Sequence, residues 1–197
     1  MKFGQMVLGL VPWILFAILT QRFGDNQVAF AALISAIAAV GIAYYQRSGG
    51  IKIIEASAVV LFAAIAVVGF VGGESVDDFL ADFARGGTTL VLAAVMLVSV
   101  VTVPFTEQYA RESVDREYWD SPKFHSTNRK ISLFWGATLL VMGVGHLVAG
   151  ALQPLSDPGE GTRSVDLLLN WIVPIVLLVI AVKYTQRTAA AARTAVT

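Results

Sequence analysis

The most constraining feature of the sequence is a series of six long apolar segments that follow one another through most of the chain. They cover residues 6–22, 28–45, 53–71, 88–106, 131–150 and 167–182. A helix needs about 20 mostly apolar residues to cross the hydrocarbon core of a bilayer. We therefore predict an all-α polytopic membrane protein, a bundle of six transmembrane helices that forms one integral membrane domain over residues 1–197.

The composition argues against the main soluble classes. Apolar residues make up 56% of the 197 residues and charged residues only 14%, with zero net charge. A soluble domain carries about 25% charged residues, so a soluble enzyme is not expected. The basic residues are scattered and balanced by acids, which argues against nucleic-acid binding. The chain has no cysteine, which removes disulfides, thiolate nucleophiles and cysteine-ligated metals.

The distribution of basic residues predicts the orientation. Eleven of the 14 Lys and Arg lie at the two ends of the chain or in the second and fourth connections, and only Arg22, Arg85 and Arg163 fall on the other side. The positive-inside rule places the basic side in the cytoplasm. We expect both termini to be cytoplasmic and the protein to lie in the bacterial inner membrane, with the lipid bilayer as its immediate partner.

Two connections have a pattern of their own. Residues 74–85 place apolar side chains at helical spacing opposite four acids, which predicts a short amphipathic helix lying on the outer surface, and we favour its interpretation as a solvated cap over the bundle. Residues 107–130 contain five acids and five bases, and we interpret them as a solvated face rather than a docking surface. Ser121 followed by Pro122 is a helix-start signal, so the fifth helix is predicted to begin near Pro122.

His146, Asn170 and Pro174 form the first candidate site. His146 lies about 22 Å along the fifth helix from residue 131, and Asn170 lies at a similar depth on the neighbouring sixth helix. Pro174 has no N–H, so the carbonyl of Asn170 loses its helical partner and needs another donor, for which His146 or water is available. The group is either a packing cluster beside a kink or a ligand or proton site open to the outside.

Lys52 and Glu55 form the second candidate site, at the inner end of the third helix. Their spacing allows an i,i+3 ion pair. Ionisable side chains within a span are candidates for function. Glu55 is therefore either a boundary carboxylate paired with Lys52 or a proton-linked or cation-linked group at a cytoplasmic mouth.

Small residues and prolines indicate how the helices pack. Gly136, Gly143 and Gly150 form a seven-residue stripe on the fifth helix, and such stripes let helix backbones approach closely. The stripe serves contacts either within one chain or between two copies in a homo-oligomer. Pro12 and Pro104 are predicted to break the first and fourth helices in their inner halves.

The sequence offers no reactive constellation. His125 and His146 lie on one helical run and cannot face each other as haem ligands. No His, Asp and Glu spacing fits zinc, and no phosphate-binding loop, dinucleotide fingerprint or Ser-His-Asp arrangement is present. We expect no metal, no cofactor and no catalytic residue, and a non-enzymatic protein is favoured over a membrane enzyme.

The chain resembles a known family in the order of several residues along most of its length. These residues are Pro12 and Trp13, Tyr44 and Tyr45, Lys52 and Glu55, Asn128 and Trp135, Gly143, and Asn170 and Trp171. In this order the chain is similar to the intracellular septation protein A family of bacterial inner-membrane proteins. The resemblance implies a role in cell-envelope maintenance or septation and brings no catalytic residue with it.

Two functions are therefore expected. The leading one is a non-enzymatic membrane protein that acts through envelope or division proteins as partners. The alternative is a small transporter or channel with a polar site around His146 and Asn170, which requires a hydrated path to that site.

Overall fold

The computed structural model describes residues 3–23, 27–152 and 167–194, and these residues form no strand. The helices are α1 (Phe3–Phe23), α2 (Val28–Tyr45), η2 (Arg47–Gly49), α3 (Ile53–Val71), α4 (Glu74–Val101), α5 (Phe105–Ala110), η3 (Arg116–Tyr118), α6 (Pro122–Leu152), η5 (Leu168–Ile172) and α8 (Val173–Thr194). Six helices are long and apolar enough to cross a membrane. The all-α class is confirmed. Arg163, used for the orientation, lies outside the described residues.

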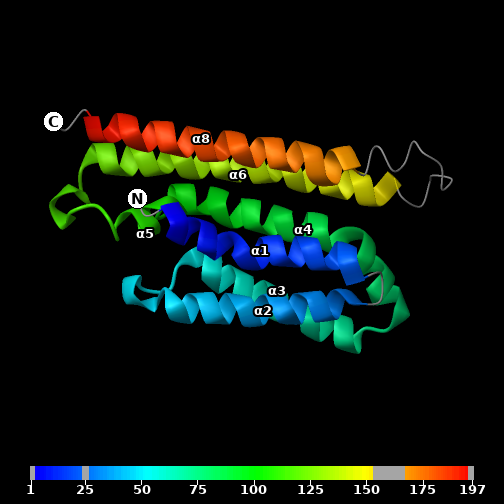
Figure 1. Ribbon diagram of the computed structural model, residues 1–197. Helices are drawn as coiled ribbons and strands as arrows, with labels where there is room; N and C mark the ends of the chain where they lie inside the picture. The colour runs from blue at the N-terminus through cyan, green and yellow to red at the C-terminus, as the bar shows by residue number, and fades with distance from the viewer. Residues whose placement is uncertain (1–2, 24–26, 153–166, 195–197) are drawn as a thin grey trace.

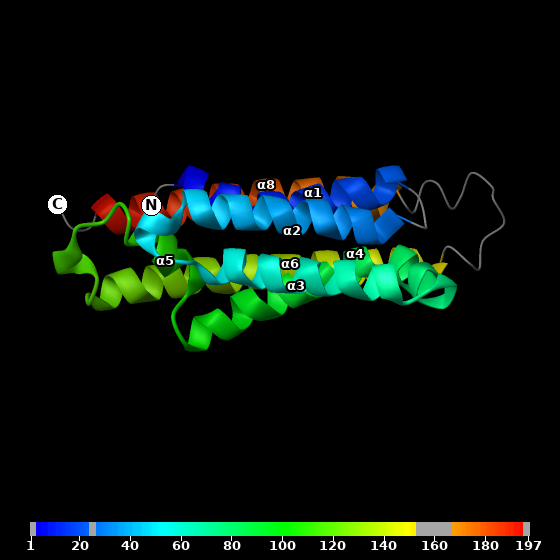
Figure 2. The same cartoon turned by 90° about the horizontal axis from the view of Figure 1, so that it is seen from below.

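The long helices run side by side in two layers, with α8, α1 and α2 in one layer and α6, α4 and α3 in the other (Figures 1 and 2). The helix α1 begins and α8 ends at the same end of the bundle, which we call the terminal end. The short helix α5 also lies there, whereas the α3–α4 turn lies at the opposite end. This arrangement follows from an even number of antiparallel spans.

Apolar side chains are exposed in the middle of the long helices. Ile37 is 63% exposed, Val60 71% and Val67 63%, whereas Phe16 and Phe62 are fully buried between helices. Water would make such a wide apolar surface unfavourable, and a bilayer removes that cost. The exposed belt therefore supports the assignment to a membrane protein.

Several predicted boundaries match the structure. The spans 28–45 and 53–71 coincide with α2 and α3. The helix α6 begins at Pro122, and the Phe124 amide donates to Ser121 Oγ at 3.2 Å, which is the capping geometry expected of Ser before Pro. The last span is longer than predicted, because α8 continues to Thr194.

The fourth span was predicted wrongly at both ends. The segment expected to form a separate surface helix is the first part of α4, which runs without interruption from Glu74 to Val101. Gly73, at φ +73°, adopts a conformation that favours glycine and turns the chain directly from α3 into α4. Leu80 and Ala84 are buried, whereas Phe79 is 61% exposed, so part of the apolar face of this segment packs on the bundle.

Pro104 does not kink a helix. The helix α4 ends three residues earlier, and Pro104 directly precedes α5 with an extended ψ of 130°. A proline disfavours helical geometry in the residue before it, which explains the end of α4. The chain then re-enters the bundle as α5. Pro12 lies inside α1, which runs as one helix from Phe3 to Phe23, so the break predicted at this proline does not occur.

The glycine stripe of α6 packs against α4 of the same chain. A Cβ at Gly136 would lie 2.6 Å from the side chain of Leu97, and one at Gly143 would lie 2.6 Å from that of Leu90. At Gly150 a Cβ would overlap the carbonyl oxygen of Asp82. The stripe therefore makes contacts within one chain, which is the first of the two alternatives predicted for it.

Candidate functional site

A cluster of buried polar side chains lies at the terminal end, between α1, α3 and α5. Its members are Gln46, Lys52, Glu55, Tyr109 and Glu112, which we call the terminal cluster; all but Glu112 are at most 2% exposed, and the Glu112 side chain is 13% exposed. Fully buried Lys and Glu are rare unless they are paired. The cluster is therefore the most unusual concentration of charge in the described residues.

Lys52 does not form the predicted ion pair with Glu55. Its Nζ lies 2.7 Å from Glu112 Oε1 and 3.5 Å from the carbonyl oxygen of Gln46. Lys52 has extended backbone angles and precedes the first turn of α3, so the i,i+3 relation of a helix does not apply to it. The sequence identified Lys52 and Glu55 as candidates. It did not identify Glu112, the ion-pair partner of Lys52, which lies 60 residues further along the chain.

Glu55 is completely buried, and its carboxylate has no well-formed hydrogen bond; the donors that face it are the backbone N–H of Lys52 and the hydroxyl of Tyr109. Its position in the first turn of α3 places it within a predicted span. Leaving a buried charge without a hydrogen bond is energetically unfavourable. Glu55 is therefore the residue of the cluster whose negative charge needs a bound proton or cation to neutralise it.

Tyr109 of α5 faces Glu55 across the cluster. A Cβ at Gly9 of α1 would lie 2.5 Å from the Tyr109 hydroxyl and 3.7 Å from Glu55 Oε1, so the bare backbone of Gly9 leaves room for both groups. Burial, reinforced by the carboxylates of Glu55 and Glu112, raises the pKa of the Tyr109 phenol. The phenol therefore stays protonated and can serve as a proton donor toward the carboxylate.

The helix α5 is held in place by hydrogen bonds at its first two residues, which precede Tyr109. Ser99 Oγ accepts from the Phe105 amide at 3.0 Å, and the Thr106 hydroxyl lies 2.9 Å from both the carbonyl of Asn128 and Ser132 Oγ. These bonds join the end of α4, α5 and the first turns of α6. They fix α5, and with it the position of Tyr109, relative to the bundle.

A second charged group ties α5 to α6. Glu107, which is 1% exposed, lies 2.6 Å from Arg111 Nη2 and 3.0 Å from His125 Nδ1. The segment 107–130 was predicted to be a solvated face, which is wrong for its first residues. All residues of α5 except Gln108 are buried, and α5 was not foreseen as a separate helix.

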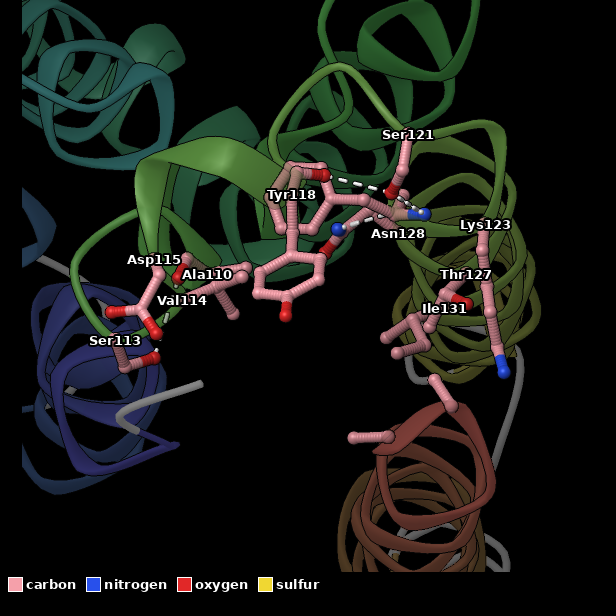
Figure 3. A pocket seen from close by; sticks show the side chains of 13 residues that line it. Ala110, Ser113, Val114, Asp115, Tyr118, Ser121, Lys123, Thr127, Asn128 and Ile131 are labelled. Carbon is pink, nitrogen blue, oxygen red and sulfur yellow. Dashed lines mark hydrogen bonds between the residues drawn. The ribbon is translucent and has the colours of Figure 1, made fainter. Parts of the chain in front are cut away.

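Two pockets flank the chain that follows α5. One has a volume of about 570 Å³ and is lined by Lys52, Gln108, Arg111, Glu112 and Trp119 among others. We call it the basic pocket. The other, of about 320 Å³, lies between this chain segment, α6 and α8, and Tyr118 points into it opposite Ile131 (Figure 3). Only the basic pocket is lined by a member of the terminal cluster.

The candidate site at the opposite end contains the predicted contact. His146 Nδ1 lies 2.7 Å from Asn170 Oδ1, and both side chains are buried. The Asn170 carbonyl, to which Pro174 can offer no N–H, accepts from Arg85 Nη2 at 2.6 Å. Arg85 is thus a donor to this carbonyl that the sequence had not suggested. It was missed because the sequence placed it at the end of a surface helix, before the fourth span.

The backbone around Asn170 is also irregular. Residues Leu168–Ile172 form a π-helical turn before α8, and the Arg85 guanidinium lies 5.5 Å from the ring centre of Trp171. Neither of the two pockets is lined by His146 or Asn170. The arrangement describes a helix start held to α4 and α6 by paired polar groups.

No group of three His, Cys, Asp or Glu side chains suited to a metal ion occurs within the described residues. Comparison with protein-family models, with curated proteins and with solved structures gave no match to this chain.

Proposed function

We propose that this protein is a proton-linked transporter of a small solute in the bacterial cytoplasmic membrane, and that Glu55 binds and releases the proton. The terminal end then faces the cytoplasm, as the distribution of basic residues predicts. The observation that carries the proposal is the fully buried carboxylate of Glu55, which has no well-formed hydrogen bond and forms no ion pair within the described residues.

The charges around Glu55 favour a proton as its occupant. The groups that face it are Lys52, which directly precedes its helix, Tyr109 of α5, and Glu112 beyond α5, while α1 presents Gly9. Lys52 is paired with Glu112 at 2.7 Å, so one ammonium faces two carboxylates and leaves the cluster with one negative charge in excess. A metal cation would need several oxygen ligands and would be repelled by Lys52, whereas a proton needs only the carboxylate.

The path of the chain also supports transport. The helix α4 stops at Val101 and α5 brings Tyr109 back to the buried carboxylate. Interrupted helices beside ionisable groups are typical of binding sites in secondary transporters. Lys52 lines the basic pocket and also acts electrostatically on Glu55. A solute in the pocket and a proton on Glu55 would therefore share Lys52 as a neighbour.

The pairing at the opposite end supports a structural role for His146 and Asn170. Their mutual hydrogen bond and the bond from Arg85 to the freed carbonyl satisfy the groups that a kinked helix start exposes. We therefore place the transport site at Glu55, and the earlier alternative around His146 and Asn170 becomes the less favoured location.

The test is a pH-jump measurement on the purified protein, reconstituted in liposomes and adsorbed on a solid-supported membrane. Proton binding to a buried carboxylate moves charge through the protein and gives a transient current. We expect the current in the wild type and its loss in Glu55→Gln. The matched control is Glu117→Gln, the same change at an exposed residue, which keeps the current. Solute pools screened by the same currents then identify the substrate.

An unchanged current in Glu55→Gln, with a melting curve like that of the wild type, would overturn the proposal. The function through envelope or division partners, which rests on the family resemblance, would then be favoured. Glu55→Asp guards against misfolding, because it keeps the carboxylate and should keep part of the current.

A further inference from the structure

We infer that the basic pocket binds a small organic carboxylate. The inference rests on the proposed function in one respect, since it names the class of solute that the Glu55 site would transport. The binding itself stands on the pocket alone. Its volume of about 570 Å³ lies in the range of small-molecule sites.

The charged side chains that line the pocket favour an anion. Lys52 and Arg111 contribute two positive charges and Glu112 one negative charge, and Gln108 adds an amide. Gln108 Oε1 already accepts a hydrogen bond from the Ile53 amide at 2.9 Å, which leaves its NH₂ group as a donor. The lining therefore has a net charge of one positive unit and a surplus of hydrogen-bond donors.

Arg111 provides the specific geometry. Its Nη2 donates to Glu107 at 2.6 Å, which fixes the guanidinium, while its buried Nε has no hydrogen-bond partner. A guanidinium presents donors in a rigid planar fork that matches a carboxylate. Glu107 occupies the Nη2 edge of Arg111, while the side chain as a whole is 39% exposed, so the other terminal nitrogen, Nη1, is the donor that can receive a second carboxylate, that of a ligand.

Trp119 forms an apolar wall of the same pocket. Its indole N–H donates to the Val114 carbonyl at 2.9 Å, which fixes the ring. The guanidinium carbons of Arg111 and Arg116 lie 5.2 Å and 5.9 Å from the ring centre. The ring contributes apolar surface beside the cationic groups, so the favoured ligand combines a carboxylate with a small apolar body.

The pocket and Glu55 would be linked through Lys52. An incoming carboxylate competes with Glu112 for the Lys52 ammonium and adds one negative charge to the cluster. A proton on Glu55 removes one negative charge. Bringing the anion and the proton together keeps the buried charge constant, which favours their joint uptake.

The experiment measures binding of radiolabelled acetate and benzoate to the purified full-length protein by scintillation proximity. Unlabelled acetamide, benzamide and benzylammonium serve as competitors of similar size without the negative charge. We expect at least one acid to bind and neither its amide nor the amine to displace it. Arg111→Gln should weaken binding by about ten-fold or more, the loss expected for a charge-assisted hydrogen bond.

The matched control is Arg116→Gln, which removes the other guanidinium near the same indole and does not line the pocket. It should bind as the wild type does. Binding of neither acid to the folded wild type, displacement by benzylammonium, or equal loss in both variants would overturn the inference.

The outcome is separable from that of the proposed function. Glu55→Gln imitates the protonated carboxyl and should still bind the acid. Carboxylate binding without any Glu55-dependent current would leave the inference standing and remove the proton-linked transport. A Glu55-dependent current without carboxylate binding would do the reverse.

Discussion

Gly9 has a role that its lack of a side chain explains. The Tyr109 hydroxyl would lie 2.5 Å from a Cβ at this position, with Glu55 Oε1 at 3.7 Å. Real Cβ atoms do not approach other atoms that closely, so any side chain must displace Tyr109, whose helix is held by hydrogen bonds. The approach of α1 to the terminal cluster therefore requires glycine.

We predict that Gly9→Ala lowers the free energy of unfolding by about 1–3 kcal/mol, the usual cost of overpacking a buried contact, and weakens the pH-jump current. Gly4→Ala is the matched control on the same helix, because a Cβ there meets nothing within 4 Å. Thermal melting in detergent measures the difference. Equal effects of the two changes would contradict the proposed contact.

For His146 and Asn170 we predict an energetic coupling without a loss of function. A double-mutant cycle with His146→Leu and Asn170→Leu should give a coupling free energy of about 0.6 kcal/mol and at most about 1.7 kcal/mol, as for other hydrogen bonds between membrane helices. A His146→Leu protein that is stable and normally abundant but transports no solute would instead return the transport site to the opposite end.

At the scale of elements, the contact between α4 and α6 depends on how closely their backbones approach. We predict that Gly150→Ala destabilises more than Gly143→Ala. The first Cβ meets the rigid carbonyl of Asp82, and the second meets the movable end of the Leu90 side chain. Gly145→Ala, with its nearest neighbour at 4.0 Å, is the control and should be nearly neutral. Denaturant titration ranks the three, and a different order would argue against this helix pair.

The sequence predicted the elements better than their connections. Apolar length alone determined α2 and α3, and the Ser121–Pro122 signal determined the start of α6. The continuation of the predicted surface helix into α4 depended on tertiary packing, because Leu80 and Ala84 find a buried surface that no local pattern reports. An amphipathic segment looks the same whether lipid or protein covers its apolar face.

The site was predictable to a similar degree. Depth along antiparallel helices was sufficient to pair His146 with Asn170, and the rarity of charge within a span was sufficient to single out Glu55. Glu112, Tyr109 and Arg85 come from distant parts of the chain. Their contacts depend on where α5 re-enters and on how far α4 extends, which hydropathy does not determine.

At the scale of the whole molecule, the orientation in the membrane is directly testable. The chain has no cysteine, so Ser75→Cys at the opposite end and Ser113→Cys at the terminal end each introduce a single thiol. Both positions are exposed. In intact cells an impermeant maleimide should label the first and should label the second only after permeabilisation. The reverse pattern would place the terminal cluster on the outer side.

The most direct test of the account is chemical modification of Glu55 in the unaltered protein. Dicyclohexylcarbodiimide partitions into apolar surroundings and reacts with carboxyl groups in their protonated form, and peptide mass spectrometry locates the product. The account predicts modification at Glu55 that decreases as the pH rises, with exposed carboxylates such as Glu117 left largely unmodified. A folded protein in which Glu55 remains unmodified at every pH, or is modified to the same extent at all of them, would contradict a proton-exchanging carboxyl at this position.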